Sequence, residues 1–255
     1  MSRHLIIPDP HAHPDYSNVR FSHLGNLVSD IKPDHVICIG DWADMPSLSS
    51  YDRGTKGFEG RRYRHDIASA IEAQELFFSP IRKAKKKLPK FWMLEGNHEY
   101  RIKRAIDADA THLEGIISTT DLSYETFGWE YVPYEGATPG ILQLDGIAYS
   151  HYFTTGVMGR PVGGLHPAYT LLNKEFMSCT QGHTHTTDYC VRTTAMKNYV
   201  HGLVAGCYID YYQDYAGGAN DMWWKGVVVK EDVQHGSYDP QWIGLNAIRT
   251  AYSET

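Results

Sequence analysis

The chain has 255 residues, 42% of them hydrophobic, and a formal net charge of −6. This length allows one core of ordinary size, and no segment is linker-like, so we expect a single domain over residues 1–255. No apolar run is long enough to cross a bilayer, and the first residues resemble a strand rather than a signal peptide. These features predict a cytoplasmic protein with no membrane partner. A disulfide framework and a zinc knuckle are disfavoured because no C-x-x-C pair occurs among Cys38, Cys179, Cys190 and Cys207.

Charge is unevenly distributed along the chain. Residues 51–104 carry 14 Lys and Arg against 7 Asp and Glu, a net charge of +7, and the remainder is −13. The basic clusters are Arg61-Arg62-Tyr63-Arg64, Lys83-Ala84-Lys85-Lys86-Lys87 and Arg101-Ile102-Lys103-Arg104. Beside a site for anions, such a stretch would attract a polyphosphate or nucleic acid. For residues 82–90 we favour the alternative of a solvated helix end, where cations suit the helix dipole.

The first part of the chain predicts alternating strands and helices. Apolar runs at 4–8, 35–39 and 90–94 end in turn residues, as buried parallel strands do. Helical spacing of apolar residues predicts helices over 18–31, 65–79 and about 98–109, with Pro80 interrupting or kinking the second. Residues 45–64 are rich in Gly and Ser and have no period, and a loop of this length is usually functional.

The later part of the chain is dominated by strand patterns. Residues 129–132, 140–144 and 146–151 indicate antiparallel strands separated by Gly, Pro and Asp turns. A helix is expected over 166–177, and further strands over 178–181, 188–194, 199–206 and 225–230. Helices early and strands late predict an α/β fold of two stacked mixed sheets flanked by helices, an αββα sandwich.

Five polar fragments each follow an apolar run. They are Asp9-Pro10-His11, Gly40-Asp41-Trp42-Ala43-Asp44, Gly96-Asn97-His98-Glu99, Ser150-His151 and Gly182-His183-Thr184-His185. Any one of them alone is explained by a turn or by a histidine packed in the core. Their joint occurrence predicts one shared site. Carboxylate, imidazole and amide oxygen without thiolate suit divalent Mn, Fe, Ni, Co or Zn.

Spacing within the fragments supports this interpretation. Asp9 and His11 are two positions apart, so on an extended strand end both side chains point to one face. His183 and His185 have the same spacing. A carboxylate at Asp41, directly after a buried strand, can reach two cations through its two oxygens.

Taken together, the five fragments resemble the calcineurin-like metallophosphoesterase superfamily over about residues 4–206. The resemblance implies a four-layer αββα fold and two divalent metals, Mn before Fe, Ni, Co or Zn. On this resemblance one metal is held by Asp9, His11 and His185, the other by Asn97, His151 and His183, and both by Asp41. His98 is then the catalytic histidine, and Asp44 orients it.

Two such metals, about 3.5 to 4 Å apart, neutralise a phosphate ester and lower the pKa of a bridging water towards ~7. The hydroxide then attacks phosphorus while His98, as imidazolium, stabilises the equatorial oxygens or protonates the leaving group. Protein phosphatases of the superfamily have Arg-Gly where Met45-Pro46 stands here, and Arg where Glu95 stands. We therefore expect a phosphodiesterase of the repair-nuclease-like branch, acting on DNA, RNA or nucleotides. The alternatives are a phosphomonoesterase for nucleotides or nucleic-acid ends and a catalytically silent metal-binding scaffold.

Several further residues have two interpretations each. Arg62, Arg64 and Arg101 could clamp phosphate bidentately or be surface charges. His13 is expected in a loop at the mouth of the site, with a substitute ligand as the alternative. Glu99 is either a support for the site or an acidic first-turn residue. For the aromatic segment 208–224, packing or a subunit interface is favoured over stacking on bases.

Overall fold

The three early apolar runs form neighbouring parallel strands in the computed structural model, which describes residues 1–51, 53–84 and 87–253. They are β1 (Ser2–Ile7), β2 (His35–Cys38) and β3 (Lys90–Leu94). On one side β4 (Trp129–Val132) adds in parallel, and on the other β12 (Gly226–Gln234) and β13 (Ser237–Gly244) add antiparallel. The order of this first sheet is β13-β12-β1-β2-β3-β4.

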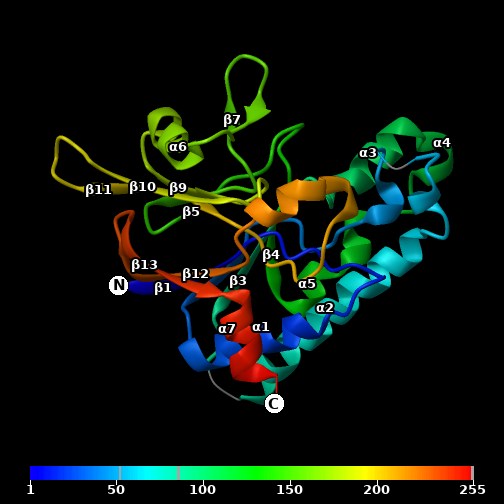
Figure 1. Ribbon diagram of the computed structural model, residues 1–255, viewed down its shortest axis with the longest axis horizontal. Helices are drawn as coiled ribbons and strands as arrows, with labels where there is room; N and C mark the ends of the chain where they lie inside the picture. Colours follow the sequence, from blue (N-terminus) through cyan, green and yellow to red (C-terminus); the bar gives the residue numbers. More distant parts are fainter. Residues whose placement is uncertain (52, 85–86, 254–255) are drawn as a thin grey trace.

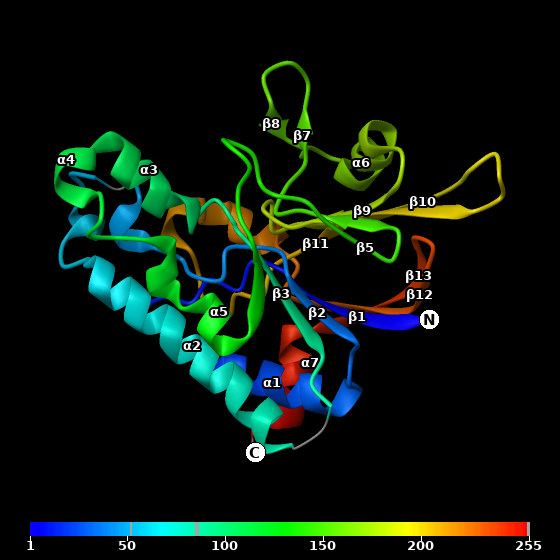
Figure 2. The same ribbon diagram turned by 180° about the vertical axis from the view of Figure 1, so that it is seen from behind.

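A second sheet has the order β10-β11-β9-β6-β5. Its strands are β5 (Leu142–Leu144), β6 (Ile147–Tyr149), β9 (Ser178–Gln181), β10 (Thr187–Thr193) and β11 (Tyr199–Ala205). β9 runs parallel to both β6 and β11, whereas β5 and β10 pair antiparallel with their neighbours. A small hairpin of β7 (Thr154–Thr155) and β8 (Arg160–Pro161) projects from this side of the molecule (Figure 2).

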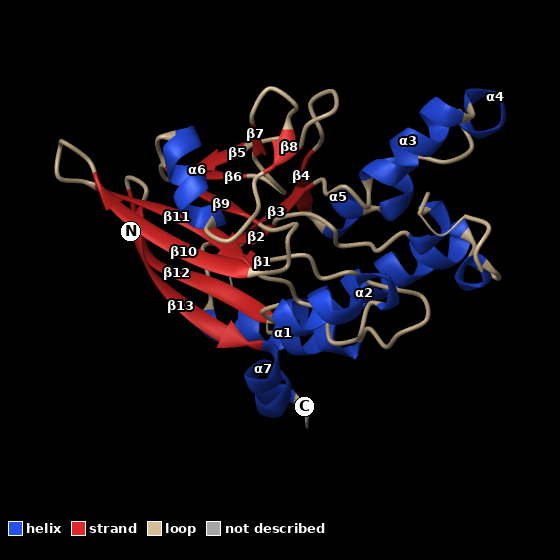
Figure 3. Cartoon of the chain, turned by 45° about the horizontal axis from the view of Figure 1, so that its top comes forward, coloured by secondary structure: helices blue, strands red, loops and turns tan. Residues whose placement is uncertain are grey.

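Apolar side chains from alternating strand positions bury both faces of the first sheet. Ile6 of β1 packs with Ile147 and Leu203 of the second sheet, whereas Leu5 packs with Leu24 and other residues of the helical side. The helices on that side are α1 (Val19–Ile31), α2 (Tyr63–Lys83) and α7 (Leu245–Tyr252), and α6 (Pro167–Glu175) covers the second sheet (Figures 1 and 3). The predicted α/β class with mixed sheets is therefore confirmed.

Two predictions about local structure are wrong. β4 pairs parallel, because the chain returns to the same edge through a crossover of α3 (Tyr100–Ala108), α4 (Ala110–Leu113), η3 (Thr119–Leu122) and α5 (Tyr124–Phe127). Of the two expectations for Pro80, interruption of the helix is wrong, because α2 continues to Lys83. Proline removes one backbone N–H donor, but only three helical residues follow it here, and its ring packs against Gly25 of α1, where an added Cβ would lie 2.6 Å from the ring.

The predicted loop 45–64 contains two short 3₁₀ segments, η1 (Pro46–Leu48) and η2 (Lys56–Phe58), and its last two residues already belong to α2. Another 3₁₀ segment, η4 (Asp214–Met222), lies in the aromatic segment 208–224. β13, α7 and the β7–β8 hairpin were not predicted from the sequence. No helix in the described ranges is long and apolar enough to cross a membrane.

Candidate metal centre

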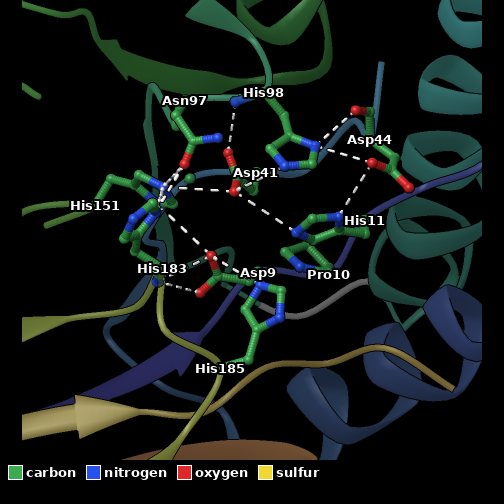
Figure 4. Close-up of polar contacts among 12 residues, drawn as sticks. Asp9, Pro10, His11, Asp41, Asp44, Asn97, His98, His151, His183 and His185 are labelled. Atoms are coloured by element: carbon green, nitrogen blue, oxygen red, sulfur yellow. Dashed lines mark hydrogen bonds and ion pairs between the residues drawn. The ribbon is translucent and has the colours of Figure 1, made fainter. Parts of the chain in front are cut away.

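The five polar fragments meet because each follows the C-terminal end of a strand. Asp9 comes after β1, Asp41 after β2 and Asn97 after β3 in the first sheet, and His151 after β6 and His183 after β9 in the second. Carboxyl ends of parallel strands share one edge of a sheet, which is where open α/β folds place their sites. Figure 4 shows the side chains of all seven predicted ligands pointing toward one another.

One group of ligand atoms consists of Asp9, His11 and His185. Their ligand atoms all lie within 4.8 Å of one another, and all three residues are buried. His11 Nε2 is a buried polar atom with no hydrogen-bond partner among the described residues. An unpaired buried nitrogen is costly unless something coordinates it, so this group could hold a metal ion.

A second group consists of Asn97, His151 and His183. Asn97 Oδ1 lies 2.9 Å from His151 Nε2 and 2.8 Å from His183 Nδ1, and the two nitrogens are 3.2 Å apart. Asp41 stands between the two groups, since its Oδ2 lies 3.4 Å from His151 Nε2 and 3.6 Å from His11 Nε2. A single carboxylate oxygen therefore faces both groups, instead of one oxygen each as expected, because Oδ1 accepts the backbone N–H of His98 at 2.9 Å.

Backbone conformation sets these residues apart from ordinary strand ends. Five of the seven have positive φ angles: Asp9 (38°), His11 (47°), Asp41 (53°), His183 (67°) and His185 (59°). The left-handed region is unfavourable for residues with a Cβ, and such strain concentrates at functional sites. Hydrogen bonds hold the strained segments, among them those from His11 N to Asp41 O (2.9 Å) and from His183 N to the Asp9 carboxylate (3.0 Å).

His98 lies beside Asp44, as the resemblance implies. Its Nδ1 is 2.6 Å from Asp44 O and 2.9 Å from Asp44 Oδ1, and because both are acceptors Nδ1 carries a proton. Its Nε2 is 3.1 Å from an amino nitrogen of Arg101, which can only donate. This geometry favours the neutral imidazole of His98 with its proton on Nδ1. Burial lowers the pKa of His98, and Arg101 lowers it further.

Glu99 supports the site rather than sitting in an exposed first turn. Its carboxylate is fully buried and accepts the backbone N–H groups of Asp41 (3.0 Å), Ala43 (2.9 Å) and Gly96 (3.0 Å). It also accepts the hydroxyl of Tyr124 at 3.0 Å. One side chain therefore joins the loop after β2 to the loop after β3.

Sequence reasoning missed Arg20 and Tyr211. The buried guanidinium of Arg20 donates to the carbonyls of Pro10 and His11, both at 2.8 Å, and pairs with Asp210 at 3.2 Å. A lone arginine on the apolar face of a predicted helix was the available signal. The hydroxyl of Tyr211 lies 3.0 Å from His11 O and 3.1 Å from Asp44 Oδ2. For Tyr211 the sequence offers only one signal, its place in the aromatic segment 208–224.

A cavity of about 550 Å³ opens over the centre. Its lining residues are Asp41, Ser49, Tyr51, Asn97, His98, Arg101, His183, His185 and Tyr215. Of the predicted substrate-binding residues, Arg101 lines this cavity, whereas Arg62 and Arg64 are exposed and do not. His13 is buried with Nε2 3.8 Å from Asp44 Oδ2, so it packs behind Asp44 instead of lying at the mouth.

The basic stretch is divided between two places. Arg101 is at the cavity, but the C-terminal end of α2, which carries Lys83, lies towards α1 and α7 (Figure 2). This location agrees with a solvated helix end. Lys85 and Lys86 lie outside the described residues.

Neither a scan against protein-family models nor a search of curated proteins finds a match. A function for this chain therefore has to be argued from the chemistry of the site.

Proposed function

We propose that this protein is a metal-dependent phosphoric ester hydrolase with the four-layer αββα fold of calcineurin-like metallophosphoesterases. The supporting observation is the convergence of seven ligand side chains from five strand ends as two groups on either side of Asp41. The residues fit divalent cations because their ligand atoms lie close together and the buried Nε2 of His11 has no hydrogen-bond partner among the described residues. Nitrogen and oxygen donors without thiolate suit Mn, Fe, Ni, Co or Zn alike. Mn is placed first on the family resemblance and not on the donor set.

Bound cations would neutralise the charge of a phosphate ester and lower the pKa of a coordinated water. The chain supplies the remaining groups. Arg101 borders the cavity, and one of its amino nitrogens is held by the carbonyls of Asp44 (2.8 Å) and Met45 (3.3 Å). The other amino nitrogen, 3.1 Å from His98 Nε2, is the donor that can turn to a phosphate oxygen. When this nitrogen turns from His98 to a phosphate, Nε2 of His98 is free to take up a proton from water. The resulting imidazolium can then donate that proton to the leaving ester oxygen, while Asp44 accepts the Nδ1–H.

The favoured substrates are phosphodiesters of nucleic acids or nucleotides. Glu95 and Met45-Pro46 stand where phosphoprotein phosphatases carry arginine-containing motifs. Glu95 is also buried and accepts the N–H of Tyr134 at 2.6 Å, so it holds the β3–β4 edge and presents no cation to a substrate. The surface offered to the ester is then Arg101 with the metal ligands.

Hydrolysis of bis-p-nitrophenyl phosphate beside p-nitrophenyl phosphate tests this proposal. Metal-stripped protein is assayed with Mn, Ni, Co, Mg or Zn added singly. Faster turnover of the diester is expected. Faster hydrolysis of the monoester would favour a phosphomonoesterase over a phosphodiesterase. If neither ester is hydrolysed with any metal, the protein is a metal-binding scaffold without this activity.

A further inference from the structure

Two tyrosines of the cavity take no part in the metal centre or in the chemistry above. Tyr51 lies in the loop between η1 and η2, and Tyr215 lies in η4, so elements far apart in the sequence bring them to one cavity. Their side chains are 83% and 63% exposed. Exposed aromatic rings beside a hydrolytic centre are available to a ligand.

The aromatic segment separates clearly into packing residues and exposed ones. Tyr208 and Tyr211 are buried, and the ring of Tyr211 stacks on Tyr16 with 4.0 Å between centroids. Across the described ranges, by contrast, no aromatic side chain packs against the ring of Tyr51 or Tyr215. Packing therefore explains the first two tyrosines but not the pair at the cavity.

Tyr215 also lies inside a concave, charged surface. Its pKa is raised, chiefly by burial of the hydroxyl and then by the carboxylates of Asp44 and Asp41. The residue is exposed to solvent, yet the carboxylates of the metal centre act electrostatically on its hydroxyl. A ligand that touches this ring would thus lie next to the position of the phosphate.

We propose that Tyr51 and Tyr215 bind the base of a nucleoside whose phosphate ester lies at Arg101 and the metal centre. The inference rests on the proposed hydrolase function and narrows its substrate class. Aromatic rings stack on any base, because every base has a π-face. Within a duplex both faces of a base are covered by its neighbours, so the substrate is a nucleotide ester or a single strand.

The test uses two diesters with the same leaving group, thymidine 5′-p-nitrophenyl phosphate and methyl p-nitrophenyl phosphate. For Tyr51→Ala and Tyr215→Ala, kcat/KM on the thymidine ester should fall about 5- to 100-fold, the range for loss of one stacking partner. The methyl ester should be hydrolysed at the wild-type rate. Tyr51→Phe and Tyr215→Phe should keep the preference. Tyr199→Ala, which removes an exposed tyrosine of β11 (55% exposed) outside the cavity, should change neither rate.

A binding measurement makes the test independent of turnover. Calorimetry should show that wild-type protein binds thymidine 5′-monophosphate more tightly than methyl phosphate, and that either alanine variant loses the difference. Equal losses on both esters, or an unchanged preference in both alanine variants, would overturn the base subsite while leaving the hydrolase intact. If neither ester is hydrolysed with any metal, the hydrolase itself fails. Dimerisation that both alanine variants abolish without changing nucleotide binding would show that the tyrosines are an interface instead.

Discussion

The carboxylate of Glu99 accepts the backbone N–H of Asp41 at 3.0 Å and thereby fixes the residue that faces both groups of ligand atoms. The same carboxylate accepts the N–H groups of Ala43 and Gly96 and the hydroxyl of Tyr124. One buried side chain is therefore the hydrogen-bond acceptor for four donors. Glu99 thus fixes the position of Asp41 through the backbone, although its carboxylate is hydrogen-bonded to no side chain of the predicted metal ligands.

Replacing Glu99 by alanine should destabilise the protein strongly. Each buried donor left without an acceptor costs about 1–3 kcal/mol, so the loss should reach at least about 3 kcal/mol. Urea unfolding would measure it, and bound metal should fall in parallel. Glu125→Ala, which removes an exposed carboxylate from α5, is the control and should change the stability by less than about 0.5 kcal/mol. A fully stable Glu99→Ala protein would contradict the role given to this residue.

Gly96 is predicted to tolerate no side chain. A Cβ at this position would lie 2.1 Å from Asp41 Oδ1 and 2.3 Å from Asp41 N, so Asp41 would have to move. Gly96→Ala should therefore lose about 1–3 kcal/mol of stability and bind less metal. Gly57→Ala is a matched change, because its Cβ would meet only Thr55 Oγ1 at 3.8 Å. The measurement is the metal content of the two variants. If Gly96→Ala binds as much metal as Gly57→Ala, a Cβ at Gly96 does not displace Asp41.

Asp41→Ala should abolish hydrolysis and lower the amount of bound metal. The carboxylate is buried, and one of its oxygens faces both His11 and His151. Metal analysis after dialysis and the ester assay give the two readouts. Asp107→Ala, which removes only an exposed ion pair with Lys103, should leave both unchanged. Full activity of the Asp41 variant would rule out the proposed role of Asp41 in a metal centre.

His98→Ala should retain metal and lose turnover. The side chain contacts Asp44 and Arg101 and is assigned no ligand role, so only proton transfer is removed, which contributes about 10²–10⁴-fold. The exposed His112 provides the control variant His112→Ala. Loss of metal from the His98 variant would mean that His98 is a ligand.

Buried His4 should make the folded state sensitive to acid. Burial and the nearby Lys230 lower its pKa from 6.5 to about 4. Between these values the unfolded chain binds a proton that the folded chain does not, so stability is full above pH 6.5 and falls as the pH drops towards 4. The contribution amounts to about 3 kcal/mol at most.

Unfolding of metal-free protein in urea at several pH values between 7 and 4 measures this effect. His4→Gln should lose less stability over this range than the wild type, whereas the exposed His112→Gln should follow the wild type. Identical pH dependence of the wild type and His4→Gln would show that His4 does not titrate as its burial requires.

Much of the architecture was predictable because its determinants are local. The runs at 35–39 and 90–94 are short, apolar and bounded by turn residues, and both became parallel strands. The five fragments could be found for the same reason, since a strand's C-terminal end and a two-residue spacing are visible in a few neighbouring letters. The family resemblance and the activity that it implies stay predictions.

The sequence by itself determined most of the strands and the polar residues that follow them, because hydrophobic period and turn chemistry act between near neighbours. Only the tertiary structure decided that β4 joins β3 in parallel, that α2 continues through Pro80, and that five ligand residues adopt left-handed conformations. It also decided that Tyr211 reaches His11, 200 positions away. Such contacts depend on how two sheets pack together, and no local pattern encodes the partner of a side chain so distant in the chain.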